Sequence, residues 1–216
     1  MGFLVSVEGI CCSGKTTLCE LLKKNLNGIG FHPIYNHGAM TYTPIGREFY
    51  DITEGKSFGI TTAYYLIDLI INCRDFITPQ MMSSDKIVML QDRYFDSITS
   101  YSNAYGIYFN KDCTIYRIPE VLVATQTIPE PHIKVFCIPP CKVIEKRMET
   151  SKHSKVHDFY RNHPNFLCTV YDELLSVAQR TPDSIIVDTS DEMSIMTAIA
   201  DISTKLVGLH NYTFRK

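Results

Sequence analysis

The sequence predicts an α/β fold in which a five-stranded parallel sheet carries helices on both faces. Short apolar runs alternate along the chain with longer stretches whose apolar residues recur at helical spacing, and this alternation is typical of parallel strands joined by helical crossovers. Some of the short runs are apolar almost throughout, as expected for strands buried on both faces. The first of them, 3–7, leads directly into a glycine-containing loop and a helix.

That loop fits the phosphate-binding pattern G-x-x-x-x-G-K-[ST]. Its residues with predicted roles in binding ATP are Gly9, Ser13, Gly14, Lys15, Thr16 and Thr17. The glycines let the backbone approach a phosphate oxygen closely, and the N–H groups at the following helix N-terminus attract an anion. We expect Lys15 to bind the reacting phosphates and Thr16 to offer its hydroxyl to Mg²⁺. In this strand–loop–helix context the motif indicates a P-loop NTPase fold, and the alternative is a glycine-rich turn that caps an ordinary helix.

The other elements follow in order. The remaining predicted strands are 31–35, 86–91, 133–138 and 184–187. The predicted helices cover 18–28, 45–52, 60–78, 97–105, 119–127, 141–149, 166–177 and 195–206. Because proline cannot donate a hydrogen bond to a neighbouring strand, Pro33 predicts either that the second strand lies at an edge of the sheet or that Pro33 lies at the start of the strand. Thr78-Pro79 and Gly208 are predicted to end the helices before them.

A carboxylate follows the third predicted strand. Asp92 comes directly after the apolar run 87–90. The carboxyl ends of parallel strands lie along one edge of the sheet, where ligands bind, so Asp92 is expected to face the phosphate loop. In that position it would hold Mg²⁺ and its water shell. The alternative is that Asp92 only caps the next helix.

The composition indicates one domain over 1–208 and a tail at 209–216. The 216 residues carry a net charge of −2 and are 45% hydrophobic, which argues against a nucleic-acid-binding face and against disorder. No cysteine pair has the spacing of a zinc motif, and we find no signal peptide and no apolar run of membrane-spanning length. We therefore expect a cytoplasmic protein that binds neither nucleic acid nor membrane.

The motifs together resemble those of the thymidylate kinase family of nucleoside monophosphate kinases. In the family's order, the sequence has Glu8 before the loop, Thr43-Pro44-Ile45-Gly46, Asp92-Arg93-Tyr94, and a Pro-Pro turn at 139–140. The resemblance covers most of 1–207. It implies ATP- and Mg²⁺-dependent transfer of a phosphoryl group to a small-molecule nucleoside monophosphate, carried out by a homodimer. Lys15, Asp92 and Arg93 would be the catalytic residues.

On the acceptor side, the resemblance assigns roles to four residues. Arg93 would grip the acceptor phosphate, for which the guanidinium fork is well suited. Tyr65 falls where the family has an aromatic residue that stacks on the base, and Tyr101 where it has a tyrosine beside the sugar. Ser97 belongs to the same run as Tyr101 and is assigned to the substrate site. Packing in the core is the alternative for Tyr65.

On the ATP side, the resemblance implies a lid. The polar stretch at about 150–164 falls where the family closes basic residues over ATP, and such closure excludes water. Lys152 and Lys155 are the predicted basic residues of this lid, with a solvated loop as the alternative. Arg147, which follows the Pro-Pro turn on the next helix, is also assigned to ATP binding.

The sequence departs from the family pattern where the base is read. The arginine that reads the thymine carbonyl falls on Leu69, and a glutamine that follows the Ala-Tyr pair falls on Ser102. In the phosphate loop, Cys11 stands where the family usually has an aspartate, and Cys12 where one subtype has an arginine. These departures leave the phosphate machinery mostly intact but change the base-reading machinery, so the acceptor need not be dTMP.

Two other functions stay open at this point. A kinase for a nucleoside or another small alcohol normally needs a carboxylate base, and the loop after the second strand offers His37 but no carboxylate before Glu48. A non-catalytic nucleotide-binding regulator would explain the missing acid at Cys11. Phosphorylation of a phosphate-free nucleoside would favour the first, and ATP binding without turnover the second.

Overall fold

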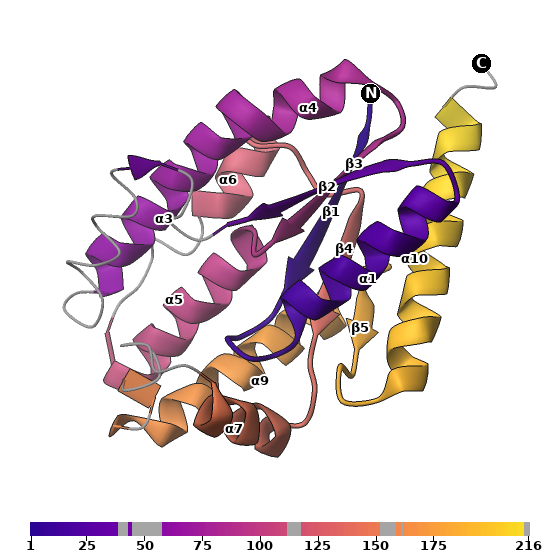
Figure 1. Ribbon diagram of the computed structural model, residues 1–216. Helices are drawn as coiled ribbons and strands as arrows, with labels where there is room; N and C mark the ends of the chain where they lie inside the picture. The colour runs from indigo at the N-terminus through magenta and orange to yellow at the C-terminus, as the bar shows by residue number, and fades with distance from the viewer. Residues whose placement is uncertain (39–42, 45–57, 112–117, 152–158, 161, 214–216) are drawn as a thin grey trace.

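A computed structural model describes residues 1–38, 43–44, 58–111, 118–151, 159–160 and 162–213 (Figure 1). In this part of the chain five parallel strands form one sheet in the order β2-β3-β1-β4-β5. The strands are β1 (Phe3–Glu8), β2 (His32–His37), β3 (Ile87–Asp92), β4 (Ile133–Cys137) and β5 (Ile185–Val187). The predicted α/β class and parallel five-stranded sheet are confirmed. β2 is an edge strand, as the proline at 33 predicts.

Helices flank the sheet on both faces (Figure 1). They are α1 (Lys15–Gly28), α3 (Phe58–Asn72), α4 (Thr78–Ser83), α5 (Phe95–Phe109), α6 (Ile118–Ala124), α7 (Cys141–Thr150), α9 (Pro164–Arg180) and α10 (Glu192–Thr213). A π-helical turn, η1 (Cys73–Ile77), joins α3 to α4. The predicted helix at 45–52 lies outside the described residues, as do Lys152 and Lys155 of the predicted lid.

Alternate residues of β1 point to opposite faces of the sheet. Phe3, Val5 and Val7 pack with apolar residues of α1 and α10 in one buried cluster. Leu4 packs on the other face, with residues of α3, η1 and α4. A central strand buried on both sides in this way is mostly apolar, and fully burying each large apolar side chain contributes roughly 1.5–3 kcal/mol. This packing fixes where β1 ends and the phosphate loop begins.

The register of the sheet brings polar residues to one edge. Asp92 at the end of β3 pairs with Val7 of β1 on one side and with His37 of β2 on the other. Glu8 pairs with Phe136 of β4. The carboxyl ends of β1, β2 and β3 therefore meet beside the phosphate loop, as expected for a doubly wound sheet.

The helix predicted to close at Thr78-Pro79 continues beyond that point, so this prediction is wrong. In η1 the Thr78 N–H bonds to the carbonyl of Cys73, a π-type bond that spans five residues. Pro79 then lies in the first turn of α4, where its missing N–H has no intrahelical partner to lose. The π turn thus accommodates the proline, and α3 and α4 continue in nearly the same direction in Figure 1.

The last helix also runs further than predicted. α10 passes through Gly208 and ends at Thr213, because a glycine inside a helix costs only about 1 kcal/mol relative to alanine and α10 is held by the buried residues Ala198, Ile199, Ile202 and Leu206. Most of the predicted tail is therefore helical. None of the helices in the described ranges is long and apolar enough to cross a membrane.

Candidate functional site

The phosphate loop wraps between β1 and α1. Gly9 has φ 152° and Gly14, the N-cap of α1, has φ 86°, values that non-glycine residues rarely adopt. Space is also limiting, because a Cβ on Gly9 would overlap Ser13 Oγ and one on Gly14 would lie 2.8 Å from Thr189 Oγ1. Both glycines are thus required by backbone conformation and by close packing. Cys12 takes a left-handed conformation as well, with φ 59°.

Two polar side chains of the loop are buried. Lys15 Nζ donates a hydrogen bond to the carbonyl of Ile10 over 2.7 Å, and burial, followed by the charge of Arg93, lowers its pKa. Among the described residues Ser13 Oγ has no hydrogen-bond partner although it is fully buried. Buried polar groups are normally satisfied, so this hydroxyl is set up to bond a ligand. Thr17, the third residue of α1, is exposed.

Asp92 is linked directly to the start of α1. Thr16 Oγ1 donates to Asp92 Oδ2 over 2.9 Å, and the hydroxyl of Tyr35 donates to the same oxygen over 3.1 Å. The other carboxylate oxygen, Oδ1, is buried without a partner in the described part of the chain. A hydroxyl and a carboxylate with a spare oxygen form the oxygen-rich donor set that Mg²⁺ prefers. Thr16 and Asp92 therefore come together as predicted for a metal site.

Arg93 turns back toward the loop. Its φ is 70°, and its Nη1 donates to the carbonyl of Gly9 over 2.9 Å. Its carbonyl accepts a 3.0 Å hydrogen bond from the buried Gln91 side chain, which in turn accepts one from Asn36. This amide pair supports the strained backbone of Arg93, whose guanidinium is directed at the phosphate loop.

The charge on Arg93 is stabilised by its surroundings. Burial alone would lower the pKa of the guanidinium, but Tyr101, Asp92, Cys11 and Tyr65 outweigh it and raise the pKa. The guanidinium carbon lies 5.7 Å from the centre of the Tyr101 ring, within cation–π range. Tyr101 and Tyr65, both assigned to the acceptor from the sequence, therefore lie near Arg93.

Ser97 is hydrogen-bonded to the buried side chain of Glu8. Its hydroxyl and its N–H both donate to Oε2 of Glu8, and so does the N–H of Tyr94. Burial, followed by the charge of Asp96, raises the pKa of Glu8 to about 7. Glu8 thus ties the start of α5 to the end of β1. The predicted contact of Ser97 with a substrate stays a prediction.

The two residues that depart from the base-reading pattern have partners inside the protein. Leu69 is 6% exposed and packs in the apolar cluster with Leu4, Met89 and Phe95. Ser102 Oγ lies 3.0 Å from Thr62 Oγ1, and both hydroxyls are buried between α3 and α5. Neither position presents a long polar side chain of the kind that reads a base edge.

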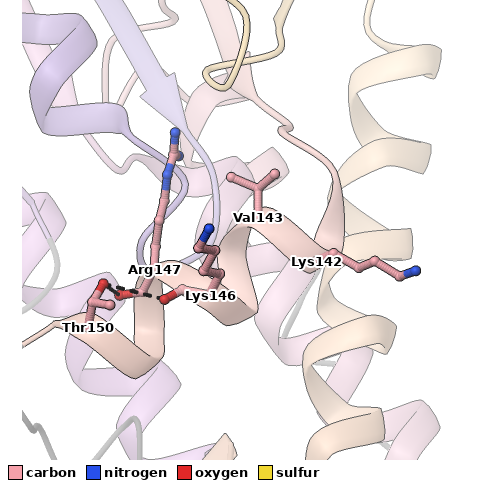
Figure 2. Close-up of a pocket in the computed structure, with 5 residues that line it drawn as sticks. All are labelled: Lys142, Val143, Lys146, Arg147 and Thr150. Atoms are coloured by element: carbon pink, nitrogen blue, oxygen red, sulfur yellow. Dashed lines mark hydrogen bonds between the residues drawn. The ribbon is translucent and has the colours of Figure 1, made fainter.

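Arg147 reaches the phosphate loop from α7. Its guanidinium donates to the carbonyl of Cys12 over 3.3 Å, to Thr189 Oγ1 over 3.1 Å and to the Thr189 carbonyl over 2.8 Å. A pocket of about 480 Å³ lies along α7, lined by Lys142, Val143, Lys146, Arg147 and Thr150. In Figure 2 the Arg147 side chain extends toward the loop, whereas Lys142 points away from it. Three positive side chains make this pocket suited to an anionic ligand.

Some residues of the site were missed by the sequence predictions. Thr189, in the turn before α10, donates to the carbonyl of Ser13 over 2.6 Å, and no motif marks it because 176 residues separate the two. Tyr35 lies on β2 and bonds Asp92. Its place near the end of a predicted strand was the available signal. Asp68, by contrast, is marked in the sequence as a carboxylate near the middle of an otherwise apolar helix, and it is buried in α3 rather than facing solvent. It accepts hydrogen bonds from the N–H and the hydroxyl of Thr43 over 2.9 and 2.7 Å.

Comparisons with known proteins point to one family. A family model described as thymidylate kinase matches residues 7–199. The chain is 30% identical over 160 residues to a thymidylate kinase of Sulfurihydrogenibium sp. (strain YO3AOP1), a match that covers 70% of this chain and 73% of the relative. It is 27% identical over 154 residues to a thymidylate kinase of Xylella fastidiosa (strain M12), covering 68% of this chain and 64% of that relative, less than two thirds of its length.

Proposed function

Because this chain belongs to the thymidylate kinase family, we propose that it transfers the γ-phosphoryl group of ATP to the phosphate of a nucleoside monophosphate. In this reaction the bond from the γ-phosphorus to the β–γ bridging oxygen breaks, a bond to an acceptor phosphate oxygen forms, and ADP leaves. The single observation that supports it best is the 2.9 Å hydrogen bond between Thr16 and Asp92. This bond joins the phosphate loop to the carboxylate at the end of β3, the strand beside β1 in the sheet.

ATP binding is supported by the form of the loop and by its charges. Burial, and then the positive charge of the nearby Arg93, lowers the pKa of Lys15. Two cations held beside one another favour an anion between or beside them. Ser13 Oγ, buried without a partner among the described residues, would provide a further bond to a phosphate. Arg147 would add positive charge from α7.

Thr16 and Asp92 would hold the Mg²⁺ that family members use. Their oxygens fit a hard cation, and the spare Oδ1 of Asp92 is the observation that favours this site. The metal would neutralise phosphate charge. Tyr35, which donates to Asp92 Oδ2, would keep the carboxylate oriented. Lys152 and Lys155 of the predicted lid would close over ATP, and they lie outside the described residues.

Arg93 would bind the acceptor phosphate and orient it toward ATP. Its charge is favoured by its neighbours, and fixing two reactants in line supplies much of the catalysis in phosphoryl transfer. Tyr101 lies beside the guanidinium and would contact the sugar, while Tyr65 would stack on the base. Burial raises the pKa of the Cys11 thiol, whereas the positive charges of Arg93 and Lys15 act in the opposite direction.

For the acceptor, the proposal is a pyrimidine or modified nucleotide other than dTMP. Leu69 and Ser102 stand where the family uses an arginine and a glutamine to read the base. In this chain Leu69 packs in the core and Ser102 is hydrogen-bonded to Thr62. Hydrogen bonds from a site to its substrate can contribute about 10⁴–10⁵-fold to the preference for that substrate. Without the two family side chains, this chain lacks such bonds to thymine, so we expect another monophosphate to compete successfully with dTMP.

The test is a panel of nucleoside monophosphates, dTMP included, with ATP and Mg²⁺ and with ADP release as the readout. We expect turnover of at least one pyrimidine nucleotide, a lower kcat/KM for dTMP, and loss of turnover in Lys15→Ala. ATP binding that persists while no acceptor yields ADP would contradict the proposal and favour a nucleotide-binding regulator.

One observation favours a nucleoside kinase as the second candidate. His37 lies at the end of β2 in register with Asp92, and burial lowers its pKa, so the imidazole is neutral near pH 7 and able to accept a proton from a hydroxyl. The panel should therefore include the matching nucleosides without phosphate. Faster turnover of a nucleoside than of its monophosphate would favour this second function.

We also propose that the chain acts in the cytoplasm, and that it acts there as a homodimer, as the resemblance implies. The exposed apolar side chain of Ile67 on α3, with 51% of its surface accessible, supports an interface through the long helices. Light scattering coupled to size exclusion would test this, with Ile67→Arg as the variant expected to favour the monomer.

A further inference from the structure

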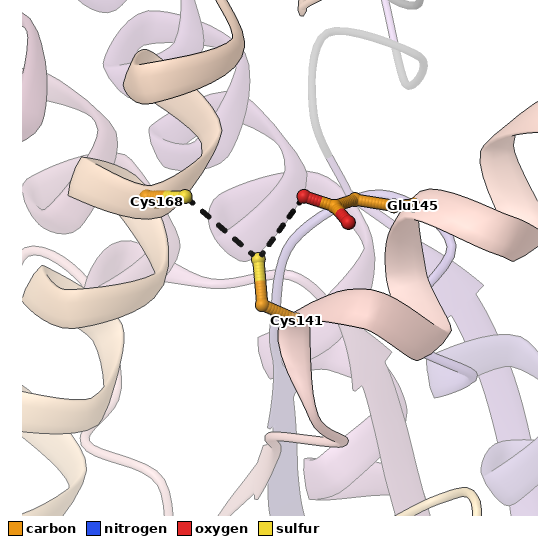
Figure 3. A group of neighbouring side chains, drawn as sticks. All are labelled: Cys141, Glu145 and Cys168. Atoms are coloured by element: carbon orange, nitrogen blue, oxygen red, sulfur yellow. Dashed lines mark hydrogen bonds between the residues drawn. The ribbon is translucent and has the colours of Figure 1, made fainter.

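Three side chains with metal-binding atoms meet between α7 and α9. Cys141 is the first residue of α7, Glu145 lies one turn later, and Cys168 lies on α9. The Cys141 sulfur is 4.0 Å from the Cys168 sulfur and 4.0 Å from Glu145 Oε1, and the three ligand atoms all lie within 4.8 Å of one another. Figure 3 shows the three side chains converging from the two helices.

These distances match a tetrahedral cation site. With zinc–sulfur bonds near 2.3 Å, two sulfurs on one zinc ion lie about 3.8 Å apart, close to the 4.0 Å observed. A disulfide needs sulfurs about 2.05 Å apart, and both cysteines are free thiols. The arrangement therefore fits a shared ion better than a bond between the two sulfurs.

A second carboxylate lies near this group in the sequence of α9. Asp172 lies one turn beyond Cys168 on α9, at the spacing that places two side chains on the same face of a helix. Each helix thus contributes a cysteine followed by a carboxylate four residues later.

We propose that Cys141, Glu145 and Cys168 form a binding site for a thiophilic divalent cation, with Zn²⁺ as the best-fitting ion. Two sulfurs select for such a cation over Mg²⁺, which prefers oxygen ligands alone. Each thiol releases its proton to the solvent when it binds the metal as thiolate, and Asp172 or water completes the coordination. This site is separate from Thr16 and Asp92.

The proposed ion would connect the two helices that flank the predicted lid. α7 ends at Thr150 and α9 begins at Pro164, so an ion held by both helices fixes the two ends of that segment relative to each other. The same α7 carries Arg147, which contacts the phosphate loop. Metal binding is therefore expected to raise the melting temperature of the folded chain.

The test uses the full-length protein, reduced with a phosphine and freed of metal, and then titrated with Co²⁺ and Zn²⁺. We expect one Co²⁺ per chain with a sulfur-to-cobalt charge-transfer band, which Zn²⁺ abolishes by displacement. An ion at Thr16 and Asp92 gives no such band, because that site offers only oxygen. Calorimetry then measures the Zn²⁺ affinity of each variant.

Matched variants locate the site. Cys168→Ser removes an exposed thiol and is expected to fold, and Cys141→Ser tests the other sulfur; each should remove the band. Glu145→Gln should weaken Zn²⁺ binding by about tenfold or more, whereas Glu149→Gln, one turn later on the same helix, should leave it unchanged. The inference is wrong if the wild type shows no band or if the band survives in both serine variants.

Discussion

The hydroxyl of Thr16 lies 2.9 Å from Oδ2 of Asp92 and donates a hydrogen bond to it. The contact joins the first turn of α1 to the end of β3 across 76 residues of sequence. It also leaves Oδ1 of the same carboxylate buried without a partner within the described chain. Since an unsatisfied buried oxygen is costly, this arrangement supports the proposal that the pair holds a cation.

Asp92→Asn should therefore impair catalysis far more than folding. The amide keeps the shape and still accepts from Thr16 and Tyr35, but it removes the negative charge that would hold Mg²⁺, and losing such an electrostatic contact costs about a hundredfold in kcat. Steady-state ADP release against Mg²⁺ concentration measures this. Asp201→Asn, on the exposed side of α10, is the control and should keep the wild-type rate. Near-normal turnover of Asp92→Asn would exclude a metal-binding role.

A second prediction concerns the close packing of the phosphate loop. Gly14→Ala places a methyl group 2.8 Å from Thr189 Oγ1 in a left-handed conformation, so we expect a loss of about 1–2 kcal/mol from the backbone alone and weaker ATP binding. Gly28→Ala is the matched control, because its Cβ would meet no atom within 4 Å. That change should stabilise α1 by roughly 0.5–1 kcal/mol. Urea unfolding and ATP titration measure both, and equal effects at the two glycines would contradict the prediction.

The architecture could be predicted because it rests on local patterns. Apolar runs locate the strands, Pro33 marks β2 as an edge, and the phosphate motif locates the loop, so fold class and family are confirmed. Each of these signals lies within a few neighbouring residues. The helix ends at Thr78-Pro79 and Gly208 were predicted wrongly, because a π turn and tertiary packing overrode the local signal of proline and glycine.

The contacts that complete the site could not be read in the same way. Ser97 bonds Glu8 across 89 residues, and Thr189 bonds the loop at Ser13 across 176. Hydroxyl residues are common and carry no spacing rule that identifies a distant partner. Leu69 shows the same limit: its departure from the family arginine was visible, but its place in the core depends on how α3 packs on β1 and β3.

The buried acid Glu8 predicts a pH effect on stability. Its pKa is raised from 4.5 to about 7 by burial and then by Asp96, while Lys134, which pairs with Asp96 over 3.1 Å, acts in the opposite direction. A carboxyl that binds its proton more tightly when folded stabilises the fold fully below its unfolded pKa. This contribution is lost as pH rises through about 7. The wild type should thus lose part of its unfolding free energy between pH 5 and about 8.

Glu8→Gln tests this because the amide oxygen can still accept from Tyr94 and Ser97. Urea midpoints of the variant should fall less between the two pH values than those of the wild type. Glu20→Gln on the exposed side of α1 should keep the wild-type slope. Parallel pH profiles for wild type and Glu8→Gln would show that Glu8 is not the group responsible.

The last prediction asks whether the family arginine can be restored at Leu69. The side chain is 6% exposed and packs with Leu4, Met89 and Phe95, so Leu69→Arg buries a charge among apolar groups. We expect a loss on the order of 3–5 kcal/mol, as for other uncompensated buried charges, and no gain of dTMP turnover. Met196→Arg, on α10 and 57% exposed, should change stability by only about 0.5 kcal/mol. A folded Leu69→Arg enzyme with increased kcat/KM for dTMP would show instead that the position faces the acceptor base.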